Sequence, residues 1–158
     1  MSAKSKVYVE TTIPSLLTAR LSRDILIAGQ QQATRDWWQE RRGHYKLHVS
    51  GLVLIECRRG DADAAQARES ALDGCDILEF SAVAEELART ILASKLIPAK
   101  ASADAAHIAI AAVHGMDFLL TWNCRHIANA AIVEKVRDVC SKSGFQAPVI
   151  CTPFELML

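Results

Sequence analysis

The 158-residue sequence lacks net charge and long apolar runs. Its 18 basic residues balance its 18 acidic residues, so no overall charge draws the protein onto nucleic acid or anionic lipid. Binding to a nucleic acid would therefore need a local basic patch or a bound cation. No apolar run approaches the roughly 20 residues of a membrane-spanning helix, and the first residues do not have the pattern of a signal peptide. We expect a cytoplasmic protein that makes no use of a membrane.

The sequence also lacks any C-x-x-C pair, although it has five cysteines. This odd number of widely spaced residues predicts reduced thiols, several of them filling the core. The cysteines are Cys57, Cys75, Cys124, Cys140 and Cys151. No repeat, linker or low-complexity segment divides the chain, so we expect a single domain over residues 1–158. A core of that size needs no disulfide or structural metal to hold it together.

Short β-type runs alternate with helical patterns from one end of the sequence to the other. The expected strands cover residues 6–10, 45–50, 76–80, 118–121 and 149–151. The expected helices, with their caps, cover residues 12–20, 22–42, 52–59, 61–74, 81–95, 102–114 and 130–143. Each connection between strands is long enough for a parallel crossover. The predicted fold class is therefore α/β: an α/β/α sandwich with a central, mostly parallel sheet of four to five strands.

Polar residues and glycines predict where the helices begin and end. Side-chain N-caps are expected at Thr12, Ser22, Asp61, Ser81 and Ser102. Helices are expected to stop at Gly43, Gly115 and Gly144. The segment from Thr152 to Glu155 has the pattern of a capping box that opens a terminal turn.

Three acidic residues are expected near the carboxyl ends of strands, where open parallel sheets bind ligands. Glu10 ends the first strand, Glu56 borders the apolar face of the helix at 52–59, and Asp104 stands in the first turn of the helix at 102–114. Each residue also has a simpler explanation. Glu10 could be a solvated strand end, Glu56 could pair with a neighbouring arginine, and Asp104 could interact with the helix dipole.

Two further polar residues belong to the same end of the predicted sheet. His107 lies one helical turn after Asp104, and a histidine in such a position is more often a hydrogen-bonded core residue than a ligand. Asn123 follows the fourth strand, where its amide could contact a ligand or close an Asx-type turn.

The combination of these residues is more specific than any one of them. Two carboxylates about 4 Å apart repel by roughly 4 kcal/mol at an effective dielectric constant of 20, so a cluster of acids is costly without a cation. Oxygen ligands without an organised set of cysteines and histidines favour Mg²⁺ or Mn²⁺ over Zn²⁺.

Four segments resemble the signatures of the PIN domain, in the order that this family has them. They are residues 7–14 (VYVETTIP), 53–61 (VLIECRRGD), 104–109 (DAAHIA) and 119–126 (LLTWNCRH). The resemblance extends from Lys6 to about Phe154 and is strongest to the small prokaryotic PIN proteins grouped with the VapC toxins of toxin–antitoxin systems.

The resemblance implies an Mg²⁺- or Mn²⁺-dependent endoribonuclease whose ion, held by Glu10, Glu56 and Asp104, activates a water to attack an RNA phosphate. It places Asn123 at the fourth position of the site and makes Thr12 the hydroxyl that follows the first acid. Arg58, Arg59 and Arg125 lie near these segments and are candidates for holding the RNA backbone.

Two departures from the family pattern leave another function open. Most members have aspartate where this sequence has Glu10, and many have aspartate in place of Asn123. A catalytically impaired PIN fold that binds RNA or a protein partner without cutting is therefore an alternative. A cysteine-dependent enzyme, using Cys57 or Cys124 with a nearby histidine, is a second alternative.

The resemblance also implies protein partners. VapC-like proteins are commonly neutralised by a small antitoxin and commonly form homodimers through helices. Trp37 and Trp38 are adjacent on the long helix at 22–42 and cannot both face one core. One of them is expected either to meet a partner or to lie along a loop of its own chain.

Overall fold

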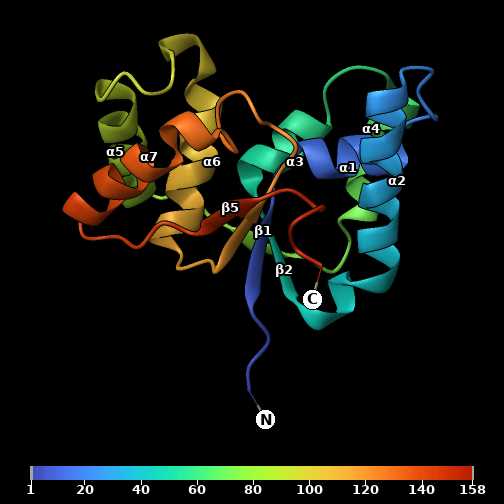
Figure 1. The fold of residues 1–158 in the computed structure, drawn as a ribbon, viewed down its shortest axis with the longest axis horizontal. Coiled ribbons are helices and arrows are strands. Elements are labelled where there is room, and N and C mark those ends of the chain that lie inside the picture. The colour runs from blue at the N-terminus through green and yellow to red at the C-terminus, as the bar shows by residue number, and fades with distance from the viewer. Residues whose placement is uncertain (1, 158) are drawn as a thin grey trace.

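The computed structural model describes residues 2–157, which fold around a five-stranded parallel sheet (Figure 1). The strands are β1 (Lys6–Val9), β2 (Lys46–Ser50), β3 (Asp76–Leu78), β4 (Phe118–Leu120) and β5 (Val149–Cys151). They lie in the order β3-β2-β1-β4-β5, and every neighbouring pair is parallel. The predicted parallel α/β architecture is therefore confirmed.

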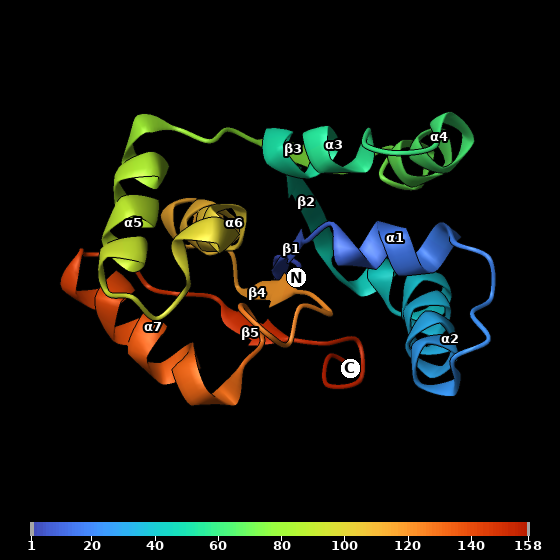
Figure 2. The same ribbon diagram turned by 90° about the horizontal axis from the view of Figure 1, so that it is seen from above.

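Seven α-helices cover the sheet within the described residues. They are α1 (Thr12–Thr18), α2 (Ile25–Glu40), α3 (Gly51–Cys57), α4 (Ala62–Ala71), α5 (Ala82–Ala93), α6 (Ser102–Val113) and α7 (Ala130–Lys142). Helices α1 to α4 lie on one side of the sheet and α5 to α7 on the other, so the sheet is the middle of three layers (Figure 2). Two short 3-10 turns, Arg42–His44 and Ala99–Ala101, precede β2 and α6.

The central strand is β1, because it pairs with β2 on one side and β4 on the other. Val7 pairs with Leu47 of β2 and with Phe118 of β4. Val7, Tyr8 and Val9 are all fully buried, since helices cover both faces of the strand. The strand expected at residues 6–10 is therefore buried on both faces, and Tyr8 brings a polar group into the core.

The helix caps agree with the sequence at two positions. The side chains of Asp61 and Ser81 accept hydrogen bonds from the backbone N–H groups of Ala64 and Ala84 and so cap α4 and α5, as predicted. Near the chain end, the Thr152 N–H and hydroxyl both donate to the Glu155 carboxylate, in the predicted terminal turn.

Three predicted N-caps are wrong. Helix α2 begins at Ile25 and is capped by Asp24, because that carboxylate, rather than Ser22, lies beside the free N–H groups of the first turn. Ser102 is itself helical, since a 3-10 turn runs directly into α6. Thr12 is also inside its helix, and its hydroxyl donates to the Glu10 carboxylate instead.

The two adjacent tryptophans are both buried within their own chain. Trp37 donates its indole N–H to the Leu156 carbonyl, 2.7 Å away, and stacks on Tyr45. Trp38 is 8% exposed, and the Arg42 guanidinium lies 5.0 Å from its ring centroid. The turn after α2 therefore covers the second tryptophan, as one of the two sequence-based alternatives states. These side chains give no support to a dimer interface.

None of the helices in residues 2–157 combines the length and the apolar character that a bilayer-spanning segment needs.

Candidate active site

Glu10, Glu56 and His107 come together at the carboxyl end of the sheet. Glu10 follows β1, Glu56 lies on α3 directly after β2, and His107 is on α6. One potential ligand atom from each residue lies within 4.8 Å of the others. The fold therefore gathers two of the three predicted acids, although 46 and 51 residues of chain separate the three positions.

Glu10 is a buried carboxylate that is held by neutral donors. Its side chain is 4% exposed, and the hydroxyls of Thr12 and Thr121 each donate to its Oε1 at 2.6 Å. The Thr12 backbone N–H donates to Oε2 at 3.2 Å. Because Glu10 is buried, it is not the solvated strand end that the sequence also allowed. No cationic side chain within residues 2–157 forms an ion pair with it. A buried, unpaired carboxylate of this kind is expected to need a cation.

Glu56 is held in one orientation by two donors. The Thr11 hydroxyl and His107 Nε2 both lie 2.6 Å from its Oε1. Burial by itself raises the pKa of Glu56, but the hydrogen bonds from His107 and Thr11 and the positive charge of Arg59 outweigh burial, so the pKa is below its usual value. The carboxylate is therefore ionised at neutral pH, and its Oε2 accepts no hydrogen bond from residues 2–157.

A chain of hydrogen bonds behind Glu56 fixes the orientation of His107. An ionised Glu56 only accepts, so His107 Nε2 donates to it and Nδ1 accepts from the Tyr8 hydroxyl, 2.6 Å away. The Tyr8 oxygen in turn lies 2.8 Å from the Ser50 hydroxyl. Burial raises the pKa of Tyr8 far above its usual value, so the phenol keeps its proton. His107 therefore orients Glu56 rather than offering a lone pair to a metal ion.

Asp104 lies one turn before His107 on α6 and outside the 4.8 Å cluster. Its side chain is half-buried and forms no hydrogen bond or ion pair within residues 2–157. Both carboxylate oxygens are thus available to a ligand.

Asn123 closes a turn. Its Oδ1 accepts from the His126 backbone N–H at 3.0 Å, which is the Asx-type arrangement that the sequence allowed as an alternative. Its own N–H donates to the Thr121 hydroxyl oxygen, and that hydroxyl donates to Glu10. Asn123 is therefore linked to the first acid through Thr121.

Thr121 is the residue in this site that the sequence gave least reason to select. It follows β4, and β4 pairs with β1 so that Leu120 lies beside Val9. One step further along both strands brings Thr121 beside Glu10. The sequence did predict both strand ends, but the register between the strands, which creates this contact, depends on the assembled sheet.

The three candidate arginines are exposed, and they differ in their contacts. Arg58 pairs with Glu69 at 2.8 Å, so it does not form the pair with Glu56 that the sequence also allowed. Arg59 is close enough to contribute to the lowered pKa of Glu56. Arg125 lies in the loop after β4 and forms no side-chain hydrogen bond or ion pair with the rest of residues 2–157.

The residues of the cluster fit a hard divalent cation. Two ionised carboxylates within 4.8 Å of each other repel by roughly 3 kcal/mol at an effective dielectric constant of 20. The free acceptor oxygens on Glu56 and Asp104 and the buried carboxylate of Glu10 are all oxygen donors, which Mg²⁺ and Mn²⁺ prefer. Carboxylates at this edge of a parallel sheet are typical of proteins that bind a divalent cation.

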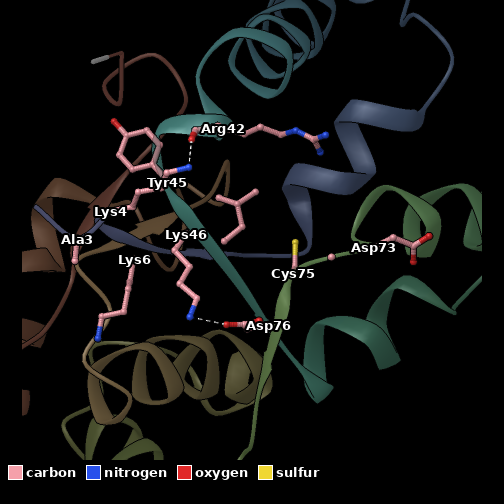
Figure 3. A pocket seen from close by; sticks show the side chains of 12 residues that line it. Ala3, Lys4, Lys6, Arg42, Tyr45, Lys46, Asp73, Cys75 and Asp76 are labelled. Atoms are coloured by element: carbon pink, nitrogen blue, oxygen red, sulfur yellow. Dashed lines mark hydrogen bonds and ion pairs between the residues drawn. The ribbon is translucent and has the colours of Figure 1, made fainter. Parts of the chain in front are cut away.

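A cavity of about 670 Å³ lies at the opposite end of the sheet, near the amino ends of β1, β2 and β3. Figure 3 shows its Lys46 side chain turned toward Asp76, with which it forms a 3.0 Å ion pair. The Lys4 ammonium donates to the Gly43 carbonyl at 2.6 Å. Open parallel sheets bind ligands at the other edge, so we assign the candidate site to the carboxylate cluster and not to this cavity.

Comparison with known proteins agrees with the fold. Residues 24–132 match the PIN domain family, and this match covers more than half of the sequence. The chain therefore belongs to the PIN domain family. Its fold is similar to that of a chain in the crystal structure of VapBC2 from Rickettsia felis bound to a DNA fragment from the promoter, with a TM-score of 0.60 and 13% identity. The alignment covers 93% of this chain and 98% of that one. A comparison with curated proteins finds no match.

Proposed function

We propose that this protein is an Mg²⁺- or Mn²⁺-dependent endoribonuclease of the VapC type, acting as the toxin of a type II toxin–antitoxin system. The observation that carries the proposal is the clustering of Glu10 and Glu56 at the carboxyl edge of a PIN fold, where no lysine or arginine within residues 2–157 is bonded to either carboxylate. Membership of the PIN family and the similarity to a chain of a VapBC structure support it.

In this proposal Glu10, Glu56 and Asp104 hold the ion. When bound, the ion supplies a water of lowered pKa and stabilises negative charge at the scissile phosphate. His107 and Thr11 hold Glu56 Oε1, so Oε2 remains free. Thr12 and Thr121 hold Glu10 Oε1 through their hydroxyls, and the Thr12 backbone N–H donates to Oε2.

Other side chains serve the RNA in this proposal. Arg59 and Arg125 are exposed near the cluster and contact the phosphate backbone. Arg58 is engaged with Glu69 and is the weakest candidate of the three arginines. Asn123 supports Thr121 through its backbone N–H, and its amide nitrogen is free to position a water.

Divalent metal ions are expected to control the activity. We expect the purified protein to cleave single-stranded RNA or tRNA with Mn²⁺ or Mg²⁺, to lose cleavage in EDTA, and to regain it when Mn²⁺ is added back. Asp104→Asn, which keeps the shape of the side chain, serves as the catalytic control. Binding of RNA without any metal-dependent cleavage would contradict the proposal and favour the catalytically impaired alternative. The Asn123 side chain, whose oxygen is engaged in a turn, is the observation that keeps that alternative open.

Cysteine chemistry is expected to play no part. Burial raises the pKa of the Cys57 thiol to about 11 and that of Cys151 to about 12, and it also raises the pKa of Cys124, which is the exposed member of the five free cysteines. At pH 8 we expect iodoacetamide to label Cys124 first, as measured by mass spectrometry, and the labelled protein to keep its RNA cleavage. If labelling abolished cleavage while Asp104→Asn spared it, the cysteine-dependent alternative would be correct.

We propose an antitoxin and a second copy of this chain as protein partners. Leu21, Ile25 and Leu26 are exposed at and before the start of α2 and offer an apolar contact surface. A monomeric mass by light scattering at micromolar concentration would contradict the homodimer. A small open reading frame next to this gene in the genome would support the antitoxin, and its absence would count against it.

A further inference from the structure

A shallow pocket of about 400 Å³ lies along the groove between α5 and α6. Figure 2 shows these two helices side by side on one side of the sheet. Ala88, Leu92 and Ala106 give the pocket apolar walls, and Leu52 at the start of α3 lines it from a third element. Its volume is in the range of small-molecule sites, which begins at about 300 Å³.

This pocket and the candidate active site are built on the same helices. Leu52 precedes Glu56 by four residues on α3, which is about one helical turn of 5.4 Å. On α6, Ala103 and Ala106 line the pocket and are the immediate neighbours of Asp104 and His107. The same two helices therefore carry both the carboxylates and the pocket walls.

Phe80 lines the pocket with an aromatic ring that the fold does not use. Its side chain is 37% exposed and is not part of the hydrophobic core. Within residues 2–157 the ring has no aromatic partner, whereas the more exposed Phe154 packs edge-on against Trp122. An unpartnered ring beside an apolar pocket is suited to stack on a flat ligand.

Arg89 adds a free cation to the same pocket. It is exposed on α5 and forms no hydrogen bond or ion pair within the described residues. Glu85, one turn earlier on the helix, also lines the pocket but does not pair with it. A guanidinium without a carboxylate partner, next to an apolar pocket, suits a ligand that carries both a phosphate and an aromatic ring.

We propose that this pocket receives one unstacked nucleobase of single-stranded RNA, next to the phosphate held at the carboxylates. Phe80 stacks on the base, and Arg89 contacts a flanking phosphate. This inference rests on the proposed ribonuclease function and assigns its substrate as RNA with a splayed base rather than a continuous duplex.

Binding of short RNA tests the pocket directly. The probe is a fluorescein-labelled single-stranded RNA hexamer in EDTA, measured by fluorescence anisotropy, beside hexamers with an abasic ribose at each position in turn. We expect Phe80→Leu, which keeps apolar bulk, to weaken binding about tenfold, as for the loss of one base–aromatic stack. Phe80→Trp is expected to bind as the wild type does. The matched control is Val83→Ala, because Val83 is an exposed apolar residue of α5 that does not line the pocket.

The abasic hexamers show whether the ring contacts a base. One abasic position is expected to cost the wild type the same tenfold, and Phe80→Leu is expected to cause no further loss on that hexamer. Arg89→Ala is expected to weaken binding to intact and abasic hexamers alike. Equal affinity of the wild type and Phe80→Leu for the intact hexamer would overturn the proposal. The proposal would also be overturned if Phe80→Leu bound RNA as the wild type does but no longer co-purified with an antitoxin, because the pocket would then hold a side chain of a protein partner.

Cleavage kinetics separate this inference from the proposed function. In an active enzyme, Phe80→Leu is expected to raise KM with little change in kcat. A wild type that fails to cleave RNA but shows the base-dependent loss of affinity would contradict the ribonuclease and leave the pocket assignment standing. If the wild type cleaves RNA and Phe80→Leu does not change KM, the ribonuclease would stand and the pocket assignment would be wrong. Thermal melting of each variant confirms that it is folded, since Phe80 lies outside the core.

Discussion

Glu56→Gln is expected to lower RNA cleavage by about 100- to 1,000-fold, the cost of removing one electrostatic stabiliser of a transition state. The substitution removes the negative charge but keeps an oxygen that can accept from Thr11 and His107. The fold is therefore retained, and the free energy of unfolding is expected to change by only about 1 kcal/mol. Initial rates with saturating Mn²⁺ measure the effect.

The matched control for this substitution is Glu69→Gln. Glu69 pairs with Arg58 on the surface, so this variant loses one exposed ion pair and is expected to cleave RNA as the wild type does. A second readout is independent of activity: Mn²⁺ at 100 times its dissociation constant stabilises a protein by about 2.7 kcal/mol, and Glu56→Gln is expected to lose most of this stabilisation. If Glu56→Gln cleaved RNA at the wild-type rate, the proposed role of Glu56 in the active site would be wrong.

His107→Ala is expected to reduce the free energy of unfolding by roughly 3 kcal/mol. The histidine is fully buried, and its loss leaves a cavity, a Tyr8 hydroxyl bonded only to Ser50, and a Glu56 carboxylate that has lost one of its two donors. For a protein of this length the melting temperature is expected to fall by about 10 °C. Thermal and urea unfolding measure both quantities.

His44→Ala is the matched control for His107→Ala. His44 is exposed in the turn before β2, and its replacement is expected to change stability by about 0.5 kcal/mol or less. Tyr8→Phe removes the hydroxyl that bonds to His107 Nδ1 and to Ser50 but leaves the ring in place, so its stability is expected to fall between those of the two histidine variants. Equal stability of the two histidine variants would show that the buried hydrogen-bond chain contributes nothing to the fold.

Local patterns in the sequence were sufficient to predict the architecture. The alternation of β-type runs with helical segments led to the parallel sheet, and the position of Glu10 and Glu56 after adjacent strands led to the carboxylate cluster. Both predictions depend on short-range signals and on one general rule about where parallel sheets bind ligands. The same kind of signal found the caps at Asp61 and Ser81.

Contacts between distant segments could not be predicted in this way. Thr121 and Tyr8 support the two acids, but each contact depends on the register of strands or on a side chain that crosses from the sheet to α6. His107 was expected to be a packed core residue, and the structure confirms this, yet its partner Glu56 is 51 residues away. The covering of Trp38 by Arg42 likewise depends on how the chain turns after α2.

The hydrogen bond from Thr121 to Glu10 joins residues 111 positions apart. During synthesis the first acid therefore leaves the ribosome long before the threonine that secures it, and β1 lies between strands that are made before and after α3 to α6. A nascent chain that ends before Thr121 thus has Glu10 and Glu56 but lacks the hydrogen bond that holds Glu10 in place. A cell that makes this protein is exposed to the assembled site only after Thr121 has been translated.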